Sequence, residues 1–183
     1  MILEDDGITP EFSRSILLDS LSVAERTHEI EASAEECKAL AERFDILSVD
    51  SLTASVRMKM LPGGELVRVR GHLKAHVTQA CVVTLEPVPE QIDEEFELIY
   101  GPEPDPESEE IVVDMDVLDP PEPIIGNAID IGEAVAEHLA LALEPFPRKD
   151  GAEFPESPPP PPEDDEPEVK PNPFAALAAL KKK

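Results

Sequence analysis

The sequence lacks several features that mark large classes of proteins. It contains no tryptophan and only two cysteines, Cys37 and Cys81, which do not make a disulfide framework. No stretch approaches 18 consecutive apolar residues, so no membrane-spanning helix is expected. The N-terminal residues MILEDDG are acidic and lack a basic region, so we expect no secretion signal and a cytoplasmic location.

Positive charge is also scarce. Fifteen Lys and Arg face 41 Asp and Glu, which gives a formal net charge of −26, and residues 76–146 contain no Lys or Arg. Most of such a surface repels nucleic acid, so basic proteins are its natural partners. DNA and membranes are not expected as partners.

Signatures of catalysis are missing as well. The chain has no H-E-x-x-H, no phosphate-binding glycine loop and no C-x-x-C, so no cofactor is expected. Cys81 could act as a nucleophile with His72 or His76, but a regular strand would place those histidines on the opposite face. We expect Cys81 to be structural, packed inside the sheet with Val83 and Leu85. A thiol enzyme or redox protein that uses Cys81 is the alternative.

The clearest positive signal is the alternation of residues 65–86. Odd positions are mostly apolar, while even positions begin as a basic series: Arg68, Arg70, His72, Lys74 and His76. A period of two predicts a strand with one buried and one polar face. Because the run exceeds the usual strand length, we expect a bend or bulge at Gly71 and a break near Gln79.

A second alternating run, residues 52–60, should pair with the first through the turn at 61–64. Pairing brings basic side chains of both strands together, and the candidate binding residues are Arg57, Lys59, Arg68, Arg70 and Lys74. The patch could hold RNA phosphates or acidic side chains. The same pattern is equally typical of an ordinary solvated strand face.

The next predicted strand, residues 92–100, has the opposite charge. Phe96, Leu98 and Tyr100 would point inward, and Asp93, Glu95 and Glu97 would point outward. Pairing with the preceding strand would neutralise part of the basic patch. Pro87 and Pro89 are expected to end the long strand, because proline cannot donate to a ladder.

Two helices are predicted from their caps. Ser33 and Glu36 form a capping box for a helix over residues 33–45, and Asp130 with Glu133 begins another over 130–143. The first buries the stripe Cys37, Leu40, Ala41 and Phe44. His138 lies on the inner side of the second helix and is expected to be a core histidine.

These elements predict an α+β domain over residues 1–147, in which two helices pack on a curved or barrel-like antiparallel sheet. Residues 101–110 form an acidic loop, and short strands are expected within 12–18, 27–31 and 111–113. Residues 148–171 are proline-rich and acidic, which is typical of a disordered spacer. Residues 172–183 read as a short docking helix that presents Phe174, Leu177 and Leu180.

The decapeptide QACVVTLEPV at residues 79–88 resembles the YceD family of large ribosomal RNA subunit accumulation proteins. Val69-Arg-Gly71, the helix from residue 129 and the terminal NPFAALAAL extend the resemblance over most of the chain. It implies a non-enzymatic role in large-subunit biogenesis and carries over no catalytic residue. Many members have C-x-x-C at the centre, but Thr84 stands at the second position here, so a zinc-binding module is only a further alternative.

The resemblance leaves two partners in competition. The acidic surface could bind a basic large-subunit ribosomal protein, and the basic patch could bind rRNA. At a charge of −26 the molecule repels RNA beyond the Debye length of about 8 Å, so we expect the ribosomal protein to be the primary partner. Contact of the patch with rRNA would be secondary, inside an assembling particle.

Overall fold

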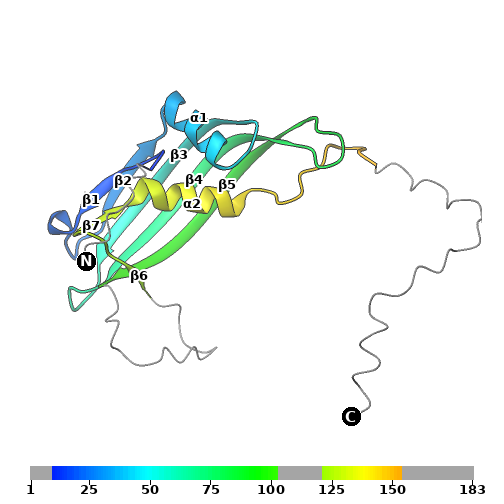
Figure 1. The fold of residues 1–183 in the computed structure, drawn as a ribbon. Coiled ribbons are helices and arrows are strands. Elements are labelled where there is room, and N and C mark those ends of the chain that lie inside the picture. The colour runs from blue at the N-terminus through cyan, green and yellow to red at the C-terminus, as the bar shows by residue number, and fades with distance from the viewer. Residues whose placement is uncertain (1–9, 103–120, 154–183) are drawn as a thin grey trace, which may run out of the picture. The chain divides into compact units, whose positions relative to one another are not determined.

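The computed structural model describes residues 10–102 and 121–153. Its main element is a five-stranded sheet with the order β2-β3-β4-β5-β6 (Figure 1). The strands are β2 (Arg26–Glu31), β3 (Ser48–Met60), β4 (Val67–Ala80), β5 (Pro87–Gly101) and β6 (Glu122–Pro123). A separate pair joins β1 (Ser15–Leu17) to β7 (Ala128–Asp130), and a 3-10 turn, η1 (Leu18–Ser20), follows β1. The helices are α1 (Ala34–Arg43) and α2 (Ile131–Ala142).

The α+β class is confirmed, but the predicted all-antiparallel pairing is wrong. Strands β2 to β5 are antiparallel, whereas the two-residue β6 runs parallel to the end of β5, so the sheet is mixed. The described strands also form an open sheet with β2 and β6 at its edges, not a closed barrel. Alternation reveals which residues share a face, but it contains no information on closure.

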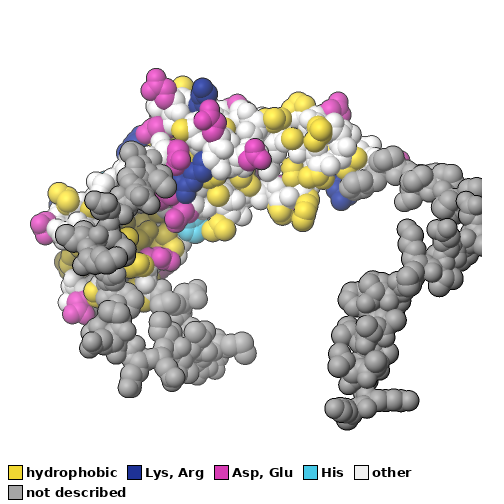
Figure 2. All heavy atoms as spheres, viewed as in Figure 1, with side chains coloured by type: hydrophobic (Ala, Val, Ile, Leu, Met, Phe, Trp, Pro, Cys, Tyr) yellow, Lys and Arg dark blue, Asp and Glu magenta, His cyan; other side chains and the backbone are white. Residues whose placement is uncertain are grey.

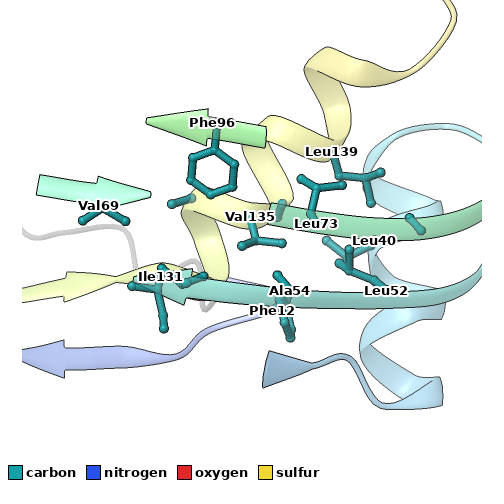
Figure 3. Close-up of a cluster of buried hydrophobic side chains, with 14 of the residues drawn as sticks. Phe12, Leu40, Leu52, Ala54, Val69, Leu73, Phe96, Ile131, Val135 and Leu139 are labelled. Carbon is teal, nitrogen blue, oxygen red and sulfur yellow. The ribbon is translucent and has the colours of Figure 1, made fainter. Parts of the chain in front are cut away.

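The alternation in β4 places one set of side chains in the core. Val67, Val69, Leu73, Ala75 and Val77 are each at most 2% exposed. Alternate residues of β3 join them, because Leu52, Ala54, Val56 and Met58 are also buried. Figure 3 shows how these side chains meet those of the helices, such as Leu40 and Leu139. One continuous core therefore lies between one face of the sheet and the two helices.

Both predicted helix starts are present. The Ser33 hydroxyl accepts a hydrogen bond from the Glu36 backbone N–H, and the Glu36 carboxylate accepts one from the Ser33 N–H, which completes the capping box. Asp130 accepts from the N–H groups of Gly132 and Glu133. The Glu133 side chain does not close a second box. It binds Arg43 instead, with an Arg43 Nη2 to Glu133 Oε1 distance of 2.6 Å, and so ties the two helices together.

The register excludes a bulge at Gly71, because the pairing of β4 with both neighbours continues unbroken through this residue. Glycine is required at position 71 by a side-chain contact. The Phe96 ring of β5 lies over it, and a Cβ atom at position 71 would sit 2.1 Å from two ring carbons. The ring of His138 stacks on the other side of Phe96, with ring centroids 4.0 Å apart. Burial in this stack lowers the pKa of His138. The residue is only partly buried, so it lies at the margin of the core and not inside it as predicted.

The connection between β4 and β5 corrects two further expectations. The strand ends at Ala80, close to the predicted break, and a turn follows over residues 82–84. Cys81 is fully buried, but Leu85 has a positive φ of 60° and is 78% exposed, so it does not pack in the sheet. Pro87 and Pro89 do not end the sheet. They lie inside β5, paired with Ala80 and Thr78.

Segments far apart in the sequence meet at the start of the chain. β1 pairs with β7, and the Arg14 guanidinium binds Glu36 at the start of α1 at 2.7 Å. Gly132, in the first turn of α2, lies so close to Phe12 that a Cβ there would be 2.5 Å from the Phe12 carbonyl oxygen. The predicted strand at 111–113, most of the acidic loop 101–110, most of the spacer and the helix with Phe174, Leu177 and Leu180 lie outside the described residues. No helix in the described ranges is long and apolar enough to cross a membrane.

Candidate functional site

The candidate site is the open face of the sheet, defined here as the polar face of β2 to β5 that no described helix covers. The registers place each predicted cation beside a residue of the next strand: Arg57 lies opposite Arg70, Lys59 opposite Arg68, and Lys74 opposite both Thr53 and Asp93. The two central strands therefore form a basic stripe, as predicted. Acidic residues of β2 and β5 border it on both sides.

The bordering carboxylates of β5 pair with the basic stripe of β4. Glu97 binds Arg70 at 2.7 Å and Arg68 at 3.0 Å, and Asp93 binds Lys74 at 3.1 Å and the His72 ring. The hydrogen bond from Arg70 lowers the pKa of Glu97, and the one from His72 lowers that of Asp93. The predicted neutralisation within the domain is confirmed.

Arg57 and Lys59 of β3 are different. Within the described part of the chain neither side chain has an ion pair or a side-chain hydrogen bond, although Arg57 is exposed and faces Arg70. Within the paired strands the open face carries five cations and five carboxylates: Arg57, Lys59, Arg68, Arg70, Lys74, Glu29, Glu31, Asp93, Glu95 and Glu97. Glu25, just before β2, adds a further negative charge near Arg70. The site is a bordered stripe with two unpaired cations, not a broad positive surface.

A second candidate lies beside the end of β5, next to the first half of α2. A cavity of about 350 Å³ has an apolar floor that includes Leu98 and Ala134, and it is ringed by Glu122, Asp130, Glu133 and Glu137. Burial raises the pKa of Glu137, and the neighbouring Glu133 and Glu122 raise it further. Burial first, and then Glu137, Glu122 and Asp130, raise the pKa of Tyr100 to about 12. The charged groups that line the cavity are therefore acidic, and Figure 2 shows acidic side chains on the side of the molecule that carries α2.

The Cys81 turn, residues 81–86, packs against the segment that follows α2. The Cys81 sulfur accepts a hydrogen bond from the Lys149 backbone N–H at 3.4 Å, and the Val82 N–H donates to the Pro147 carbonyl. Gln79 donates to the Glu144 carbonyl at 3.0 Å. The Lys149 N–H, followed by the Thr84 hydroxyl, lowers the pKa of the Cys81 thiol to about 6. His72 and His76 project from the opposite face of β4, so the sulfur has no imidazole base beside it.

Comparison with protein families decides the affiliation of the chain. Residues 69–181 match the model of a family described as large ribosomal RNA subunit accumulation protein YceD, and this match covers more than half of the sequence. The chain belongs to the YceD family. No curated protein matches it, and no solved structure does. The family description connects its members with accumulation of the large ribosomal RNA subunit.

The zinc site implied by the C-x-x-C pattern of many YceD proteins does not fit this chain. Thr84 replaces the second thiol. The segment packed against the turn offers only the Lys149 backbone N–H to the Cys81 sulfur, and an N–H group is a hydrogen-bond donor that cannot bind a metal. In the described residues no three His, Cys, Asp or Glu side chains are grouped to hold a metal ion. We therefore assign no metal to the Cys81 turn.

One feature of this YceD domain was missed in the sequence, namely the outer edge of β5. Pro87 and Pro89 stand two residues apart inside this strand, and prolines in a strand are typical of an edge. From the sequence alone they predict the end of the preceding strand. The same two residues were thus a usable signal for an unpaired strand edge.

Proposed function

We propose that this protein is a non-enzymatic factor in large-subunit biogenesis that binds a basic ribosomal protein. The supporting observation is that the acidic strand β5 already pairs with the basic residues of β4. What remains unpaired is mainly negative, in a chain of net charge −26. Such a surface attracts a lysine- and arginine-rich protein from a distance and repels free RNA.

The acidic cavity beside α2 is a suitable receptor for one basic side chain of that partner. Its carboxylates are crowded, and two cations of the described residues offset them in part: Arg43, which binds Glu133, and Arg14, which lies near Asp130. A guanidinium group would pair with Glu122 and Glu137 while its stem packs on Leu98 and Ala134. Binding would offset the repulsion from Glu133 and Glu122, which adds to the effect of burial in raising the pKa of Glu137.

Contact with rRNA has a smaller place in this proposal. Arg57 and Lys59 could each bind a phosphate without breaking an existing ion pair, whereas Arg68, Arg70 and Lys74 already have carboxylate partners. Two free cations make a weak RNA site by themselves, since each phosphate contact is screened by salt. We propose that they touch rRNA after the basic partner has delivered the protein to an assembling particle.

The terminal segment 172–183, with Phe174, Leu177 and Leu180, remains a predicted docking helix. Deleting it should leave the melting temperature of the domain nearly unchanged and weaken association with the partner. A lower melting temperature with unchanged partner binding would instead assign the segment to the fold.

The decisive experiment measures binding of the purified full chain to individual large-subunit ribosomal proteins and to naked large-subunit rRNA, each across a salt series. We expect salt-sensitive binding to a basic ribosomal protein that weakens in the double variant Glu122→Gln/Glu137→Gln. The matched control is Arg57→Glu/Lys59→Glu, which should leave that binding intact. Tight rRNA binding at physiological salt, lost in the control variant, would contradict the proposal.

A further inference from the structure

Within the described residues, the outer edge of β5 is unpaired over most of its length. β5 extends over 15 residues, but β6 pairs only with Tyr100 and Gly101. Among the described strands none pairs with the outer side of residues 87–99. Figure 1 shows this strand along one border of the sheet, beside α2. A long open edge is a template for another strand unless something prevents pairing.

The structure indicates which backbone groups face outward. The Gly101 carbonyl accepts a hydrogen bond from the Ile124 N–H at 2.8 Å, so the backbone of residue 101 points away from β4. In a strand this direction alternates, and the β4–β5 register has no shift between residues 87 and 101. The odd residues therefore point outward. Pro87 and Pro89 agree with this, because neither could donate to β4.

We propose that this edge binds an extended segment of the partner as an additional strand. The outward N–H and C=O groups of Gln91, Asp93, Glu95 and Glu97 would supply the main-chain hydrogen bonds, as in other cases of strand addition. This inference rests on the proposed function, since the segment belongs to the basic partner.

The side chains on either side of the edge define the sequence of that segment. On the open face it would meet Asp93, Glu95 and Glu97, which favour Lys or Arg at alternate positions. On the helix side lies a hollow of about 390 Å³ between the edge and α2. Its lining combines Ile92 and Leu141 with the carboxylates of Glu90, Asp93 and Glu94, and Leu141 is 80% exposed. Apolar side chains at the positions between the basic residues would pack on Ile92 and Leu141.

Charge excludes a second copy as the favoured occupant. Two β5 edges placed together would align carboxylates with carboxylates, which is unfavourable for a cross-strand pair. Within the described residues Glu90, Glu94 and Glu95 have no ion pair, so a basic strand would find unpaired carboxylates on both sides of the edge. The occupant is an extended segment that alternates basic and apolar residues.

The first test uses a fluorescent peptide of the sequence acetyl-KVKVKVKVK-amide and the purified full chain. We expect it to bind more tightly, by about tenfold or more, than acetyl-KKKKKVVVV-amide, which has the same composition but cannot present its lysines to one face. N-methylation of alternate amides on one side of the peptide should abolish binding. Equal binding of all three peptides would overturn the proposal, because attraction would then be a matter of charge alone.

Two variants at one position isolate the main-chain contribution. Glu95→Ala removes the charge and keeps the outward N–H, while Glu95→Pro removes both and, as at the native Pro89, leaves the ladder to β4 intact. We expect Glu95→Pro to bind the peptide about tenfold more weakly than Glu95→Ala. Equal affinities of the two folded variants would refute strand addition.

Amide exchange of the full chain, resolved residue by residue by NMR, supplies the second readout and does not depend on any variant. The amides of Asp93, Glu95 and Glu97 should exchange faster than those of Ile92, Glu94 and Phe96, and they should become protected when the peptide binds. Protection of the odd-numbered amides in the free protein would show the edge already occupied by the chain itself, and would overturn the proposal.

The proposed function and the proposed strand addition can be tested separately. A ribosomal protein that binds without protecting these amides leaves the proposed function standing, and peptide binding without any ribosomal partner leaves the edge standing.

Discussion

The two faces of β4 have the same backbone but opposite physical roles. On the covered face Val69, Leu73 and Val77 are at most 1% exposed and pack in the shared core. On the open face Arg70, His72 and Lys74 project into solvent and pair with carboxylates of β5. Burial of apolar surface contributes about 1.5–3 kcal/mol for each large side chain, whereas an exposed ion pair contributes between zero and about 1 kcal/mol.

This difference separates stability from recognition. Residues of the covered face are constrained by packing, so a change there is felt by the whole domain. Residues of the open face are constrained mainly by charge balance, so their identities can be adapted to a partner at a small cost in folding. The following variants test that separation, beginning with the largest expected effect.

Neighbouring residues of β4 offer the most direct comparison. Leu73→Ala should destabilise the domain by about 2–5 kcal/mol, because it leaves a cavity beneath the helices. Lys74→Ala should cost at most about 1 kcal/mol, since the ion pair with Asp93 is exposed. Urea unfolding of both variants measures the difference. Similar losses for the two would mean that the open face is also covered in the intact chain.

Gly71→Ala tests the contact between the sheet and Phe96. The added methyl group would overlap the Phe96 ring, so we expect destabilisation of about 1–3 kcal/mol and a disturbed His138 resonance. In the background of Phe96→Leu the same substitution should cost less, because the smaller side chain leaves room. If the effects of the two substitutions are additive, position 71 requires glycine for its backbone conformation and not for contact with the Phe96 ring.

The ion pair between Arg14 and Glu36 should make the stability of the domain depend on pH. Arg14 and the capping box lower the pKa of Glu36 to about 2 in the folded protein, against an ordinary value of 4.5. Because its pKa is lower in the folded state, ionised Glu36 stabilises the fold fully at pH values above about 4.5, and this stabilisation disappears as the pH falls towards 2. Glu36→Gln keeps the capping box and should remove about 1 kcal/mol of this pH-dependent stability. Unfolding curves from neutral pH to about 2 would show this as a difference in unfolding free energy between the wild type and Glu36→Gln that disappears in acid. A difference that stays constant with pH would assign the effect to packing.

Reversal of the unpaired cations should have the smallest effect on folding. In Arg57→Glu/Lys59→Glu no ion pair of the described structure is lost, so the unfolding free energy should stay within about 0.5 kcal/mol of the wild type. Electrophoretic mobility and rRNA binding should change instead. A large loss of stability would reveal that the balance of the open face supports the sheet.

The faces of the strands could be predicted from the sequence because alternation is a local property. Ser33 and Asp130 likewise identified both helix starts, since capping depends on a few adjacent residues. The function of Gly71 could not be predicted in this way, because it depends on a ring that another strand supplies. The same applies to Glu133, whose partner Arg43 lies on the other helix.

The candidate site was predictable to a similar extent. The five cations were identified and the structure brings them to one face, but their binding role stays a prediction. Neutralisation of Arg68, Arg70 and Lys74 followed from the charge pattern of residues 92–100. The open edge of β5 did not, because the direction of backbone groups depends on which neighbour a strand pairs with, and only Pro87 and Pro89 hinted at it.

The pairing of β1 with β7 has a consequence for synthesis of the chain. Ser15 lies opposite Asp130, so the first strand to be made must wait for one of the last before it can pair. At about 5–20 residues per second the ribosome needs several seconds or more to supply that partner. β2 to β5 can pair in order during this interval, whereas Phe12 and its site against α2 remain incomplete. Closure of the N-terminal segment is therefore expected to be a late folding event, and a nascent chain halted before residue 128 should remain sensitive to proteases near its N-terminus.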